Sequence, residues 1–480
     1  MELGAGTGNL SYLLLRSVYR TLSSLSVRKN GKKYPIKPRF VLTVCEHTIS
    51  RFTSNFPLED FAERNVAYWD EHRYFSEFIK KGVVDFAVYN VLEDEEIRLR
   101  HSKRILNRHT LENPVILIGN YLVDTLPTDA FSVCHEKLSE VLMNYQVRYL
   151  PEDPMFPGMA LKNNKWSKKL VFPPSLYEDE FFNEEDLKNE QKRRKEEEGD
   201  NPDTRPLPPE FHRLIYYSED DPIGKICNKL LDGYRMSFEG GNGSFLFPIG
   251  GIQMTDNLLR TFGSSMMFII GDKGDLGLTD FEGEFKPPIS IHGGSLSFLT
   301  NFHTLSNFWK HKMDMDGVNE RVFMANSAHQ FKVCAFTSGL DKTEGVEIEE
   351  AFNQVNQFSP DDYYRIYKAV DANAKPAAIH SLLRLSCNDP GMFYQYRYHL
   401  LKRFPKSSWK EDIISEILRM WGNYYHRISS LEEDIPYSLG EIFLACDRPD
   451  DALPFFKKSL QLKINAELKL EEKTTNLLKE

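Results

Sequence analysis

The chain has 480 residues, a length that predicts two or three domains at about 150 residues each. Asp and Glu total 70 against 60 Lys and Arg, so the formal net charge of −10 argues against a nucleic-acid binder with a broad basic face. Hydrophobic residues make up 41% of the chain, enough for a packed core, and no uncharged apolar stretch of about 18 residues predicts a membrane span.

The six cysteines are scattered and form no Cys-x-x-Cys pair. This spacing argues against a disulfide framework or a structural zinc site, so we expect no metal and a reducing compartment. The first residues, to about position 35, contain Arg and Ser with Glu2 as their only acid, which superficially resembles a mitochondrial transit peptide. A glycine-rich loop followed by a core helix explains the same residues better. We therefore expect a cytoplasmic protein, with a mitochondrial one as the alternative.

The most informative motif lies at the start of the chain, Met1-Glu-Leu-Gly-Ala-Gly-Thr-Gly-Asn9, ahead of a predicted helix. Its glycines are Gly4, Gly6 and Gly8, whereas the dinucleotide fingerprint G-x-G-x-x-G needs its third glycine one position later. The sequence also has no G-x-x-x-x-G-K-[ST] phosphate loop. The pattern favours a ligand without a pyrophosphate, because the glycines let the backbone approach it closely and Glu2 can meet a cationic group. The alternative is a glycine turn that only closes a strand–helix corner.

Short apolar runs after this loop predict the strands of an α/β sheet, because they are β-branched and almost continuously apolar. They cover residues 39–45, 83–89, 114–119 and 266–270, with 296–301 as a further candidate. The polar stretch 28–33 is interpreted as a loop insertion. An aromatic cluster is expected to belong to the core rather than to a stacking platform; it comprises Phe298, Phe302, Phe308 and Trp309.

Polar residues follow the predicted strands at the sheet edge where ligands bind in such folds. Glu46 follows the second strand, where a carboxylate usually accepts from both hydroxyls of a ribose. Asn90, after the third strand, is a candidate neighbour of an adenine through its amide, with Val91 packing on the ring. Asn120 ends the next strand and is a candidate partner of the ligand's amino-acid part or of the acceptor. Together with the glycine loop, these residues predict S-adenosylmethionine as the cofactor.

Several further segments resemble the MidA-like family of class I S-adenosylmethionine-dependent methyltransferases. Asn120-Tyr-Leu-Val-Asp-Thr-Leu-Pro127 stands where that family carries Asn-Glu-x-x-Asp-Ala-Leu-Pro. Residues 266–274 resemble its strand ending in Asp-x-Gly, and 294–296 and 301–303 resemble its later Gly-Thr-Leu and histidine segments. The resemblance covers residues 1 to about 340, apart from a charged insertion at 176–207. It implies a Rossmann-like methyltransferase sheet with a truncated first strand, and a protein side chain, arginine in characterised relatives, as the methyl acceptor.

Asp124 and His303 are the candidate catalytic residues. Methyl transfer to an amine or guanidinium needs a carboxylate or a histidine that orients the acceptor or takes its proton. Asp124 comes just past a predicted buried strand, and His303 lies at a predicted strand end, where a histidine can act as a base near pH 7. Each has a structural alternative: Asp124 as a helix N-cap, and His303 as an ordinary structural histidine. Asp272 likewise has a structural alternative, as a turn residue before Gly274.

The remaining chain predicts an all-α domain at 345–480, punctuated by prolines, after a methyltransferase-like domain at 1–340. The charged insertion 176–207 is interpreted as a solvated surface excursion. Residues near the end match the tetratricopeptide template, in which small side chains let two antiparallel helices approach closely. The matching residues are Leu439, Gly440, Phe443, Ala452, Phe456 and Ser459, and 382–401 fits a degenerate second copy. We expect this helical domain to serve as a platform for a protein partner.

Two functions stay open from the sequence alone. The first is an S-adenosylmethionine-dependent methyltransferase that acts on a protein substrate. The second is a catalytically weakened methyltransferase-fold scaffold or assembly factor that binds partners through its helical domain. Tyr121, which stands where the family has Glu, and the short first strand favour the scaffold. The glycine loop and Glu46 favour ligand binding.

Overall fold

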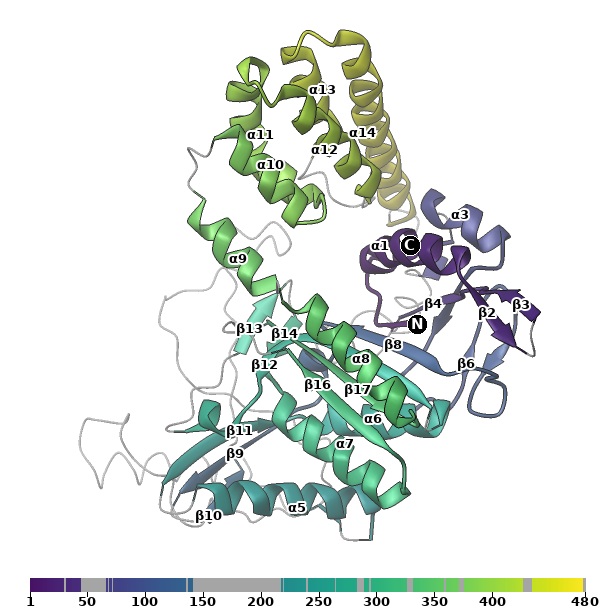
Figure 1. Ribbon diagram of the computed structural model, residues 1–480, viewed down its shortest axis with the longest axis vertical. Coiled ribbons are helices and arrows are strands. Elements are labelled where there is room, and N and C mark those ends of the chain that lie inside the picture. Colours follow the sequence, from purple (N-terminus) through teal and green to yellow (C-terminus); the bar gives the residue numbers. More distant parts are fainter. Residues whose placement is uncertain are drawn as a thin grey trace. The chain divides into compact units, whose positions relative to one another are not determined.

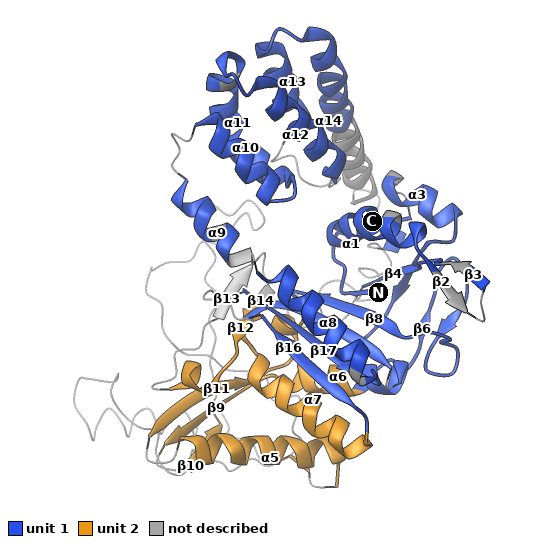
Figure 2. Ribbon diagram, viewed as in Figure 1, with its two compact units in different colours: residues 1–122, 257–273, 318–480 blue, residues 123–256, 274–317 orange. Residues whose placement is uncertain are grey.

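The computed structural model describes most of the chain outside the predicted insertion. The described residues are 1–29, 32–44, 66–67, 69–70, 72–134, 137–140, 217–218, 220–238, 241–263, 265–282, 289–292, 295–325, 331–357, 360–370, 375–425 and 434–477. They form two compact units, coloured separately in Figure 2. Unit 1 comprises Met1–Leu122, Asn257–Lys273 and Val318–Glu480, and unit 2 comprises Val123–Asp256 and Gly274–Gly317. The predicted charged insertion lies outside the described residues.

Unit 1 is built on a mixed sheet with the strand order β16-β17-β12-β8-β1-β4-β5 (Figure 1). The strands are β1 (Glu2–Leu3), β4 (Phe40–Val44), β5 (Val84–Val88), β8 (Val115–Asn120), β12 (Met266–Asp275), β16 (Glu320–Met324) and β17 (Phe331–Ser338). The run from β12 to β5 is parallel throughout, whereas β17 pairs antiparallel with both β12 and β16. The predicted α/β fold followed by a helical region is confirmed at this level.

The predicted strands at 39–45, 83–89, 114–119 and 266–270 correspond to β4, β5, β8 and the first half of β12. The interpretation of Asp272 as a turn residue was wrong, because β12 continues to Asp275 and pairs Asp272 with Lys332 of β17. The Asp272 side chain is fully buried. The predicted loop at 28–33 was also wrong, since β2 (Ser26–Lys29) and β3 (Lys32–Pro35) form an antiparallel hairpin. Cross-strand backbone pairing overrides the polar composition there.

Two helices, α1 (Asn9–Ser24) and α3 (Arg73–Lys80), contribute to a hydrophobic cluster with β4 and β5. On α1 the buried residues Tyr12 and Leu15 lie three positions apart, on one helical face. From α3 the cluster receives Phe75, and from β5 it receives Phe86. Beyond β5 the short strands β6 (Ile97–Arg98) and β7 (Ile105–Leu106) form another hairpin. The start of the chain is thereby packed into a continuous core.

Unit 2 contains a three-stranded antiparallel sheet in the order β10-β9-β11. Its elements include β9 (Asp129–Cys134), β10 (Lys137–Glu140), α5 (Pro222–Ser237), β11 (Asn242–Phe247), η3 (Leu278–Phe281) and α7 (Phe302–Asp316), while α6 (Ile249–Phe262) begins here. The candidate strand at 296–301 is divided between β14 (Ser295–Phe298), which pairs with β13 (Ile289–His292), and β15 (Thr300–Asn301). The four aromatic residues predicted for the core are all buried, which confirms that prediction.

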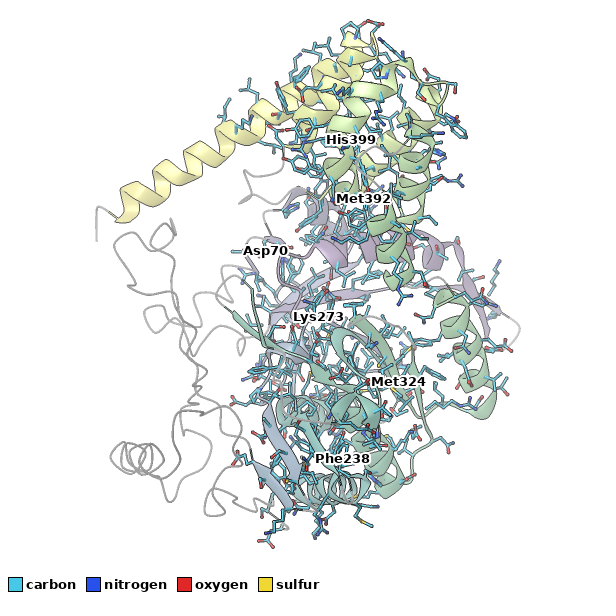
Figure 3. All side chains as sticks on the ribbon, turned by 90° about the vertical axis from the view of Figure 1, so that its left-hand side faces the viewer. Asp70, Phe238, Lys273, Met324, Met392 and His399 are labelled. Carbon is cyan, nitrogen blue, oxygen red and sulfur yellow. The ribbon has the colours of Figure 1, made fainter. Side chains whose placement is uncertain are left out.

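The helical region of unit 1 starts with α8 (Lys342–Val355) and α9 (Pro360–Ala369). The helices that follow are α10 (Pro376–Leu385), α11 (Pro390–Arg403), α12 (Lys410–Asn423), α13 (Ile435–Ala445) and α14 (Pro449–Leu477), with η4 (Phe404–Lys406) after α11. Buried residues from α10 to α14 form one hydrophobic cluster. Met392 of α11 belongs to it and is labelled among these helices in Figure 3. The predicted helical character of this part is confirmed.

The residues that match the tetratricopeptide template lie on the helical hairpin of α13 and α14. Leu439, Phe443 and Ala452 are buried in its interior. A Cβ atom added to Gly440 would lie 2.6 Å from the Phe456 ring, so only glycine permits this approach of the two helices. The hairpin is closed by the N-cap of α13, because the Ser459 hydroxyl donates to Asp434 Oδ2 at 2.6 Å.

We expect Gly440→Ala to lower the free energy of unfolding by about 1–3 kcal/mol, because the added methyl group overpacks the contact with Phe456. The matched control is Gly233→Ala in the interior of α5, where an added Cβ has no heavy atom of a described residue within 4 Å. That change is expected to stabilise by about 0.5–1 kcal/mol through helix propensity alone. Denaturant unfolding of both variants measures the difference, and equal effects of the same sign would contradict the packing argument.

Candidate functional site

The three glycines of the first loop all have a left-handed backbone. Gly4, Gly6 and Gly8 have φ angles of 63°, 52° and 79°. Any other L-residue in this conformation costs about 1–2 kcal/mol, because its Cβ approaches the neighbouring carbonyl oxygen. The loop is held by a hydrogen bond from the Gly8 N–H to the Ala5 carbonyl at 2.8 Å. This geometry explains why glycines occur at these three positions.

The loop lies at the carboxyl end of β1, in the middle of the parallel part of the sheet. The next strands of this sheet along the chain, β4 and β5, lie on one side of β1, and the later strands β8 and β12 lie on the other side. The strand order therefore reverses at β1, and open α/β sheets bind ligands outside the carboxyl ends of their strands at such a reversal. Gly6 and Thr7 are exposed there, and a Cβ on Gly6 would meet no heavy atom within 4 Å. The described residues leave open space on this side of the loop.

Glu2 is a buried carboxyl group directly before the loop. It is only 6% exposed, and its Oε2 accepts a hydrogen bond from the Ser11 hydroxyl of α1. Burial raises the pKa of Glu2 to about 7, although the bond from Ser11 acts in the opposite direction. A cation bound nearby would stabilise the charged form of this carboxyl and lower its pKa again.

Asn120 ends β8, the strand next to β1. The register pairs Leu3 with Gly119, which places Asn120 at the same sheet edge as the start of the glycine loop. Asn120 is half-buried. The following residue, Tyr121, has a positive φ of 50° and packs its half-exposed ring against Phe331, with the ring centroids 5.4 Å apart. Glu2, the glycine loop and Asn120 are thus brought together at adjacent strand ends.

Asn90 and Val91 follow β5 at the same edge, two strands from β1. The Asn90 side chain accepts from the Leu92 N–H at 3.0 Å and donates to Glu93 Oε2 at 3.0 Å. Val91 is fully buried, and its carbonyl accepts from the Asn257 amide at 3.1 Å. In this structure both residues hold the turn after β5, so their contact with an adenine stays a prediction. Glu46, predicted to hold a ribose, lies outside the described residues.

The candidate base Asp124 belongs to unit 2, in the short 3-10 helix η1 (Val123–Thr125). It is only 5% exposed, and its Oδ2 accepts a hydrogen bond from the Ser297 hydroxyl at 2.5 Å. Ser297 lies on β14, far along the chain from Asp124. The sequence contains no spacing signal that would pair the two residues.

His303 also belongs to unit 2. It is the second residue of α7, whose N-cap, Asn301, is the last residue of β15. Its Nδ1 is 2.8 Å from the hydroxyl oxygen of Tyr234, a buried residue of α5. The same hydroxyl lies 2.8 Å from Thr304 Oγ1 and accepts from the Asn301 amide at 3.0 Å. Burial lowers the pKa of His303, and the charge of Lys310 adds to this effect. The imidazole is therefore neutral at pH 7, as a base requires.

Three aromatic side chains behind the glycine loop were missed by the sequence analysis. A Cβ on Gly8 would lie 3.0 Å from Trp69 Nε1 and 3.3 Å from the Tyr425 hydroxyl oxygen. The His72 ring stacks on Tyr425 at 4.4 Å between centroids. These residues are far from the loop in sequence, and no motif connects them to it. Only the packing of the chain shows that they form one wall of the loop.

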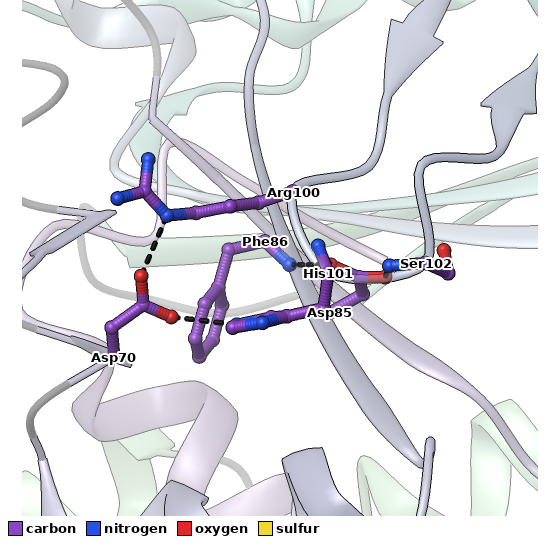
Figure 4. A network of polar contacts seen from close by, with 6 residues as sticks. All are labelled: Asp70, Asp85, Phe86, Arg100, His101 and Ser102. Atoms are coloured by element: carbon purple, nitrogen blue, oxygen red, sulfur yellow. Dashed lines mark hydrogen bonds and ion pairs between the residues drawn. The ribbon is translucent and has the colours of Figure 1, made fainter.

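A network of polar contacts joins β5 to the residues that follow β6 (Figure 4). Asp70 accepts from Arg100 Nε at 2.6 Å, and His101 Nε2 lies 2.6 Å from its other oxygen. Asp85 accepts from the backbone N–H groups of Phe86, His101 and Ser102 at 2.8–2.9 Å. Burial opposes ionisation of Asp85, but these donors outweigh it, so the pKa lies below its usual range. The network fixes the turn after β6.

A groove of about 570 Å³ shares Arg100 with this network. Its lining residues are Val66, Ala87, Val88, Arg98, Leu99, Arg100, Lys103 and Ile105. Arg98 and Arg100 are already paired with Glu96 and Asp70, at 2.5 and 2.6 Å. We assign no ligand to this groove, because carboxylates balance two of its three cationic side chains.

No family model, curated protein sequence or solved structure matches this chain. Within the described ranges, no group of three or more His, Cys, Asp or Glu side chains has the arrangement of a metal site. None of the helices in the described part of the chain combines the length and the apolar character needed to cross a membrane. The candidate site therefore has to be judged on its own geometry.

Proposed function

We propose that this protein is an S-adenosylmethionine-dependent methyltransferase that acts on a protein side chain. The observation that carries the proposal is the loop of three left-handed glycines at the carboxyl end of β1, where the strand order reverses. The acceptor class, an arginine side chain, comes from the MidA-like resemblance alone. The acidic net charge of the whole chain would suit a cationic acceptor.

The described residues fit the proposed cofactor. Gly6 leaves room for close approach, and Glu2 offers a carboxylate to a positively charged group. The N-cap of α1 is Gly8, which has no side chain to cap this helix end, and the N-terminus of a helix attracts a carboxylate such as that of an amino-acid moiety. In the same turn the Ser11 N–H already donates to Glu2. Asn120 supplies an amide at the neighbouring strand end.

The chemistry needs few groups from the protein. When bound, S-adenosylmethionine would supply a methyl group on its sulfonium; the acceptor attacks the methyl carbon in line, and the C–S bond breaks so that the sulfur leaves as a neutral thioether. The protein contributes alignment, which lowers such barriers by about 7–11 kcal/mol, and a group that orients the acceptor or takes its proton. The sequence predicts Asp124 for this role, and within unit 2 the Ser297 hydroxyl holds one of its oxygens. His303, kept neutral by burial and bonded to Tyr234, is the second candidate base.

Titration calorimetry with S-adenosylmethionine tests the proposal directly. We expect the intact chain to bind it and Glu46→Ala to abolish binding, because the sequence predicts that Glu46 holds the ribose. An intact chain that binds no S-adenosylmethionine would contradict the proposal. A methyl-transfer assay with labelled cofactor on a cell extract, followed by identification of the labelled species, would then define the acceptor.

We also expect the affinity for S-adenosylmethionine to rise about tenfold between pH 6 and pH 8. Glu2 has a pKa of about 7, so its carboxyl is mostly neutral at pH 6 and mostly charged at pH 8. A cationic ligand favours the charged form, and its binding therefore releases a proton and strengthens with pH. Calorimetry at both pH values measures the slope. In Glu2→Gln the part of the pH dependence that comes from this carboxyl should vanish. An identical pH dependence of affinity in the variant would show that Glu2 does not interact with the ligand.

The alternative is a scaffold that keeps the fold but has little or no methyl-transfer activity. Tyr121, at the position where the MidA-like family carries a carboxylate, favours it, because its half-exposed ring packs on Phe331 and offers no negative charge. In this case the helical region would act by binding a protein partner. Binding of S-adenosylmethionine without any labelled product in the extract would support this alternative.

A further inference from the structure

The end of α12 contacts the glycine loop at the other end of the chain. The Tyr425 hydroxyl donates a hydrogen bond of 2.8 Å to the Thr7 carbonyl. Tyr425 follows α12 by two residues and is only 5% exposed. A side chain of the helical region thus bonds directly to the backbone of the loop that the sequence predicts to hold the cofactor.

Aromatic packing holds Tyr425 in place. Its ring stacks on His72 with an interplanar angle of 10°, and its centroid lies 5.2 Å from that of Tyr12 on α1. Tyr425 belongs to the same hydrophobic cluster as Ala5 of the loop and Trp69. A second bond runs in the opposite direction, from the Tyr12 hydroxyl to the Gly422 carbonyl of α12 at 3.2 Å. The contact is therefore a packed junction with hydrogen bonds from both sides.

Among the described residues, the junction lies on one side of the loop. At Gly8 the space that a Cβ would take is bordered by Trp69 and Tyr425, whereas at Gly6 no described residue has a heavy atom within 4 Å of the corresponding position. Tyr425 therefore supports the loop at Gly8 and does not itself cover the Gly6 side. This arrangement fits a residue that holds the loop in a binding conformation rather than one that blocks it.

We propose that Tyr425 is a positioning residue of the cofactor site, so that the helical region sets the conformation of the glycine loop. The hydroxyl fixes the Thr7 carbonyl, and the stacked ring fixes the hydroxyl. Glycines at positions 4, 6 and 8 give this backbone wide conformational freedom, and a carbonyl fixed between Gly6 and Gly8 reduces the freedom that is lost on binding. The inference rests on the proposed function for its ligand, but its structural part can be measured without one.

The test is Tyr425→Phe, which keeps the stacked ring and removes only the hydroxyl. The control is Tyr398→Phe on α11, a 63% exposed tyrosine of the same helical region. Hydrogen exchange of the free protein is measured for the loop amides and for the hairpin of α13 and α14. Loss of one hydrogen bond is expected to speed exchange at residues 5–8 about fivefold, with no change in the hairpin and no change in the control.

Calorimetry with S-adenosylmethionine is the second measurement, and Tyr425→Phe is expected to weaken binding by about the same factor. Unchanged loop exchange, or equal effects in loop and hairpin, would overturn the positioning role. If the wild-type chain binds no S-adenosylmethionine, the proposed function fails, whereas loop exchange still decides whether Tyr425 controls the loop. Faster loop exchange combined with unchanged affinity in a binding wild type would also overturn the inference.

Discussion

Gly6→Ala is expected to weaken binding of S-adenosylmethionine by a factor of about 5–30. At a φ of 52° an alanine costs about 1–2 kcal/mol, so the free loop would relax to another conformation. Ligand binding would then have to restore the left-handed conformation, and this cost lowers the affinity. The added methyl group would also occupy the side of the loop on which no described residue has a heavy atom within 4 Å of its position. Calorimetry of the variant at a fixed pH measures the loss.

Gly82→Ala is the matched control for this prediction. Gly82 has a φ of 65° and the same open space around its Cβ position, but it precedes β5 at the amino edge of the sheet. Both variants should lose similar stability in thermal unfolding, and only Gly6→Ala should lose ligand affinity. Equal affinities in the two variants would show that the loop does not contact the ligand.

Asp124→Asn is expected to reduce methyl transfer by a factor of about 10²–10⁴ and to leave cofactor affinity unchanged. The amide has the shape of the carboxylate and can still accept from the Ser297 hydroxyl, so the fold around it is preserved. It has lost the negative charge that orients a cationic acceptor and the basicity that takes its proton. Transfer of labelled methyl groups to the proteins of a cell extract measures turnover.

Ser297→Ala separates the positioning of Asp124 from its chemistry. Without the hydroxyl one oxygen of Asp124 loses a hydrogen bond, but the charge stays, so a smaller loss of turnover is expected than in Asp124→Asn. A turnover equal to wild type in Asp124→Asn would remove this residue from the catalytic assignment and leave His303 as the candidate. Loss in both variants together with loss of the thermal transition would indicate a structural role instead.

The strands of the sheet were largely predictable, and the reason is local. Residues 39–45 and 83–89 are short apolar runs because β4 and β5 are buried on both faces, and this burial leaves a mark in composition. The run at 114–119 is equally apolar, although Ile116 of β8 is 53% exposed.

β16 and β17 were not identified, since both contain polar residues within the strand. β16, at the sheet edge, includes Glu320 and Arg321, and β17 includes Lys332 and Thr337. Asp272 was not recognised as a strand residue for a similar reason. A charged residue inside a strand is explained only by the partner strand, here by the pairing of Asp272 with Lys332 of β17.

Some features of the candidate site could likewise be predicted from the sequence, and others could not. The left-handed glycines of the first loop could be anticipated, because glycine spacing reports directly on backbone conformation. The internal bonds of Asn90, the Ser297 partner of Asp124 and the Tyr234 partner of His303 could not, since each joins side chains whose meeting depends on packing. His303 was expected at a strand end and lies instead in the first turn of α7.

By itself the sequence determined an α/β sheet that begins with a glycine loop and is followed by a helical region. These features depend on hydrophobic periodicity and backbone preference, which neighbouring residues encode. Only the tertiary structure decided that Tyr425 and Trp69 border Gly8, that Gly6 faces open space, and that Gly440 lies against Phe456. Contacts between different elements depend on how those elements pack, and no local pattern along the chain specifies that packing.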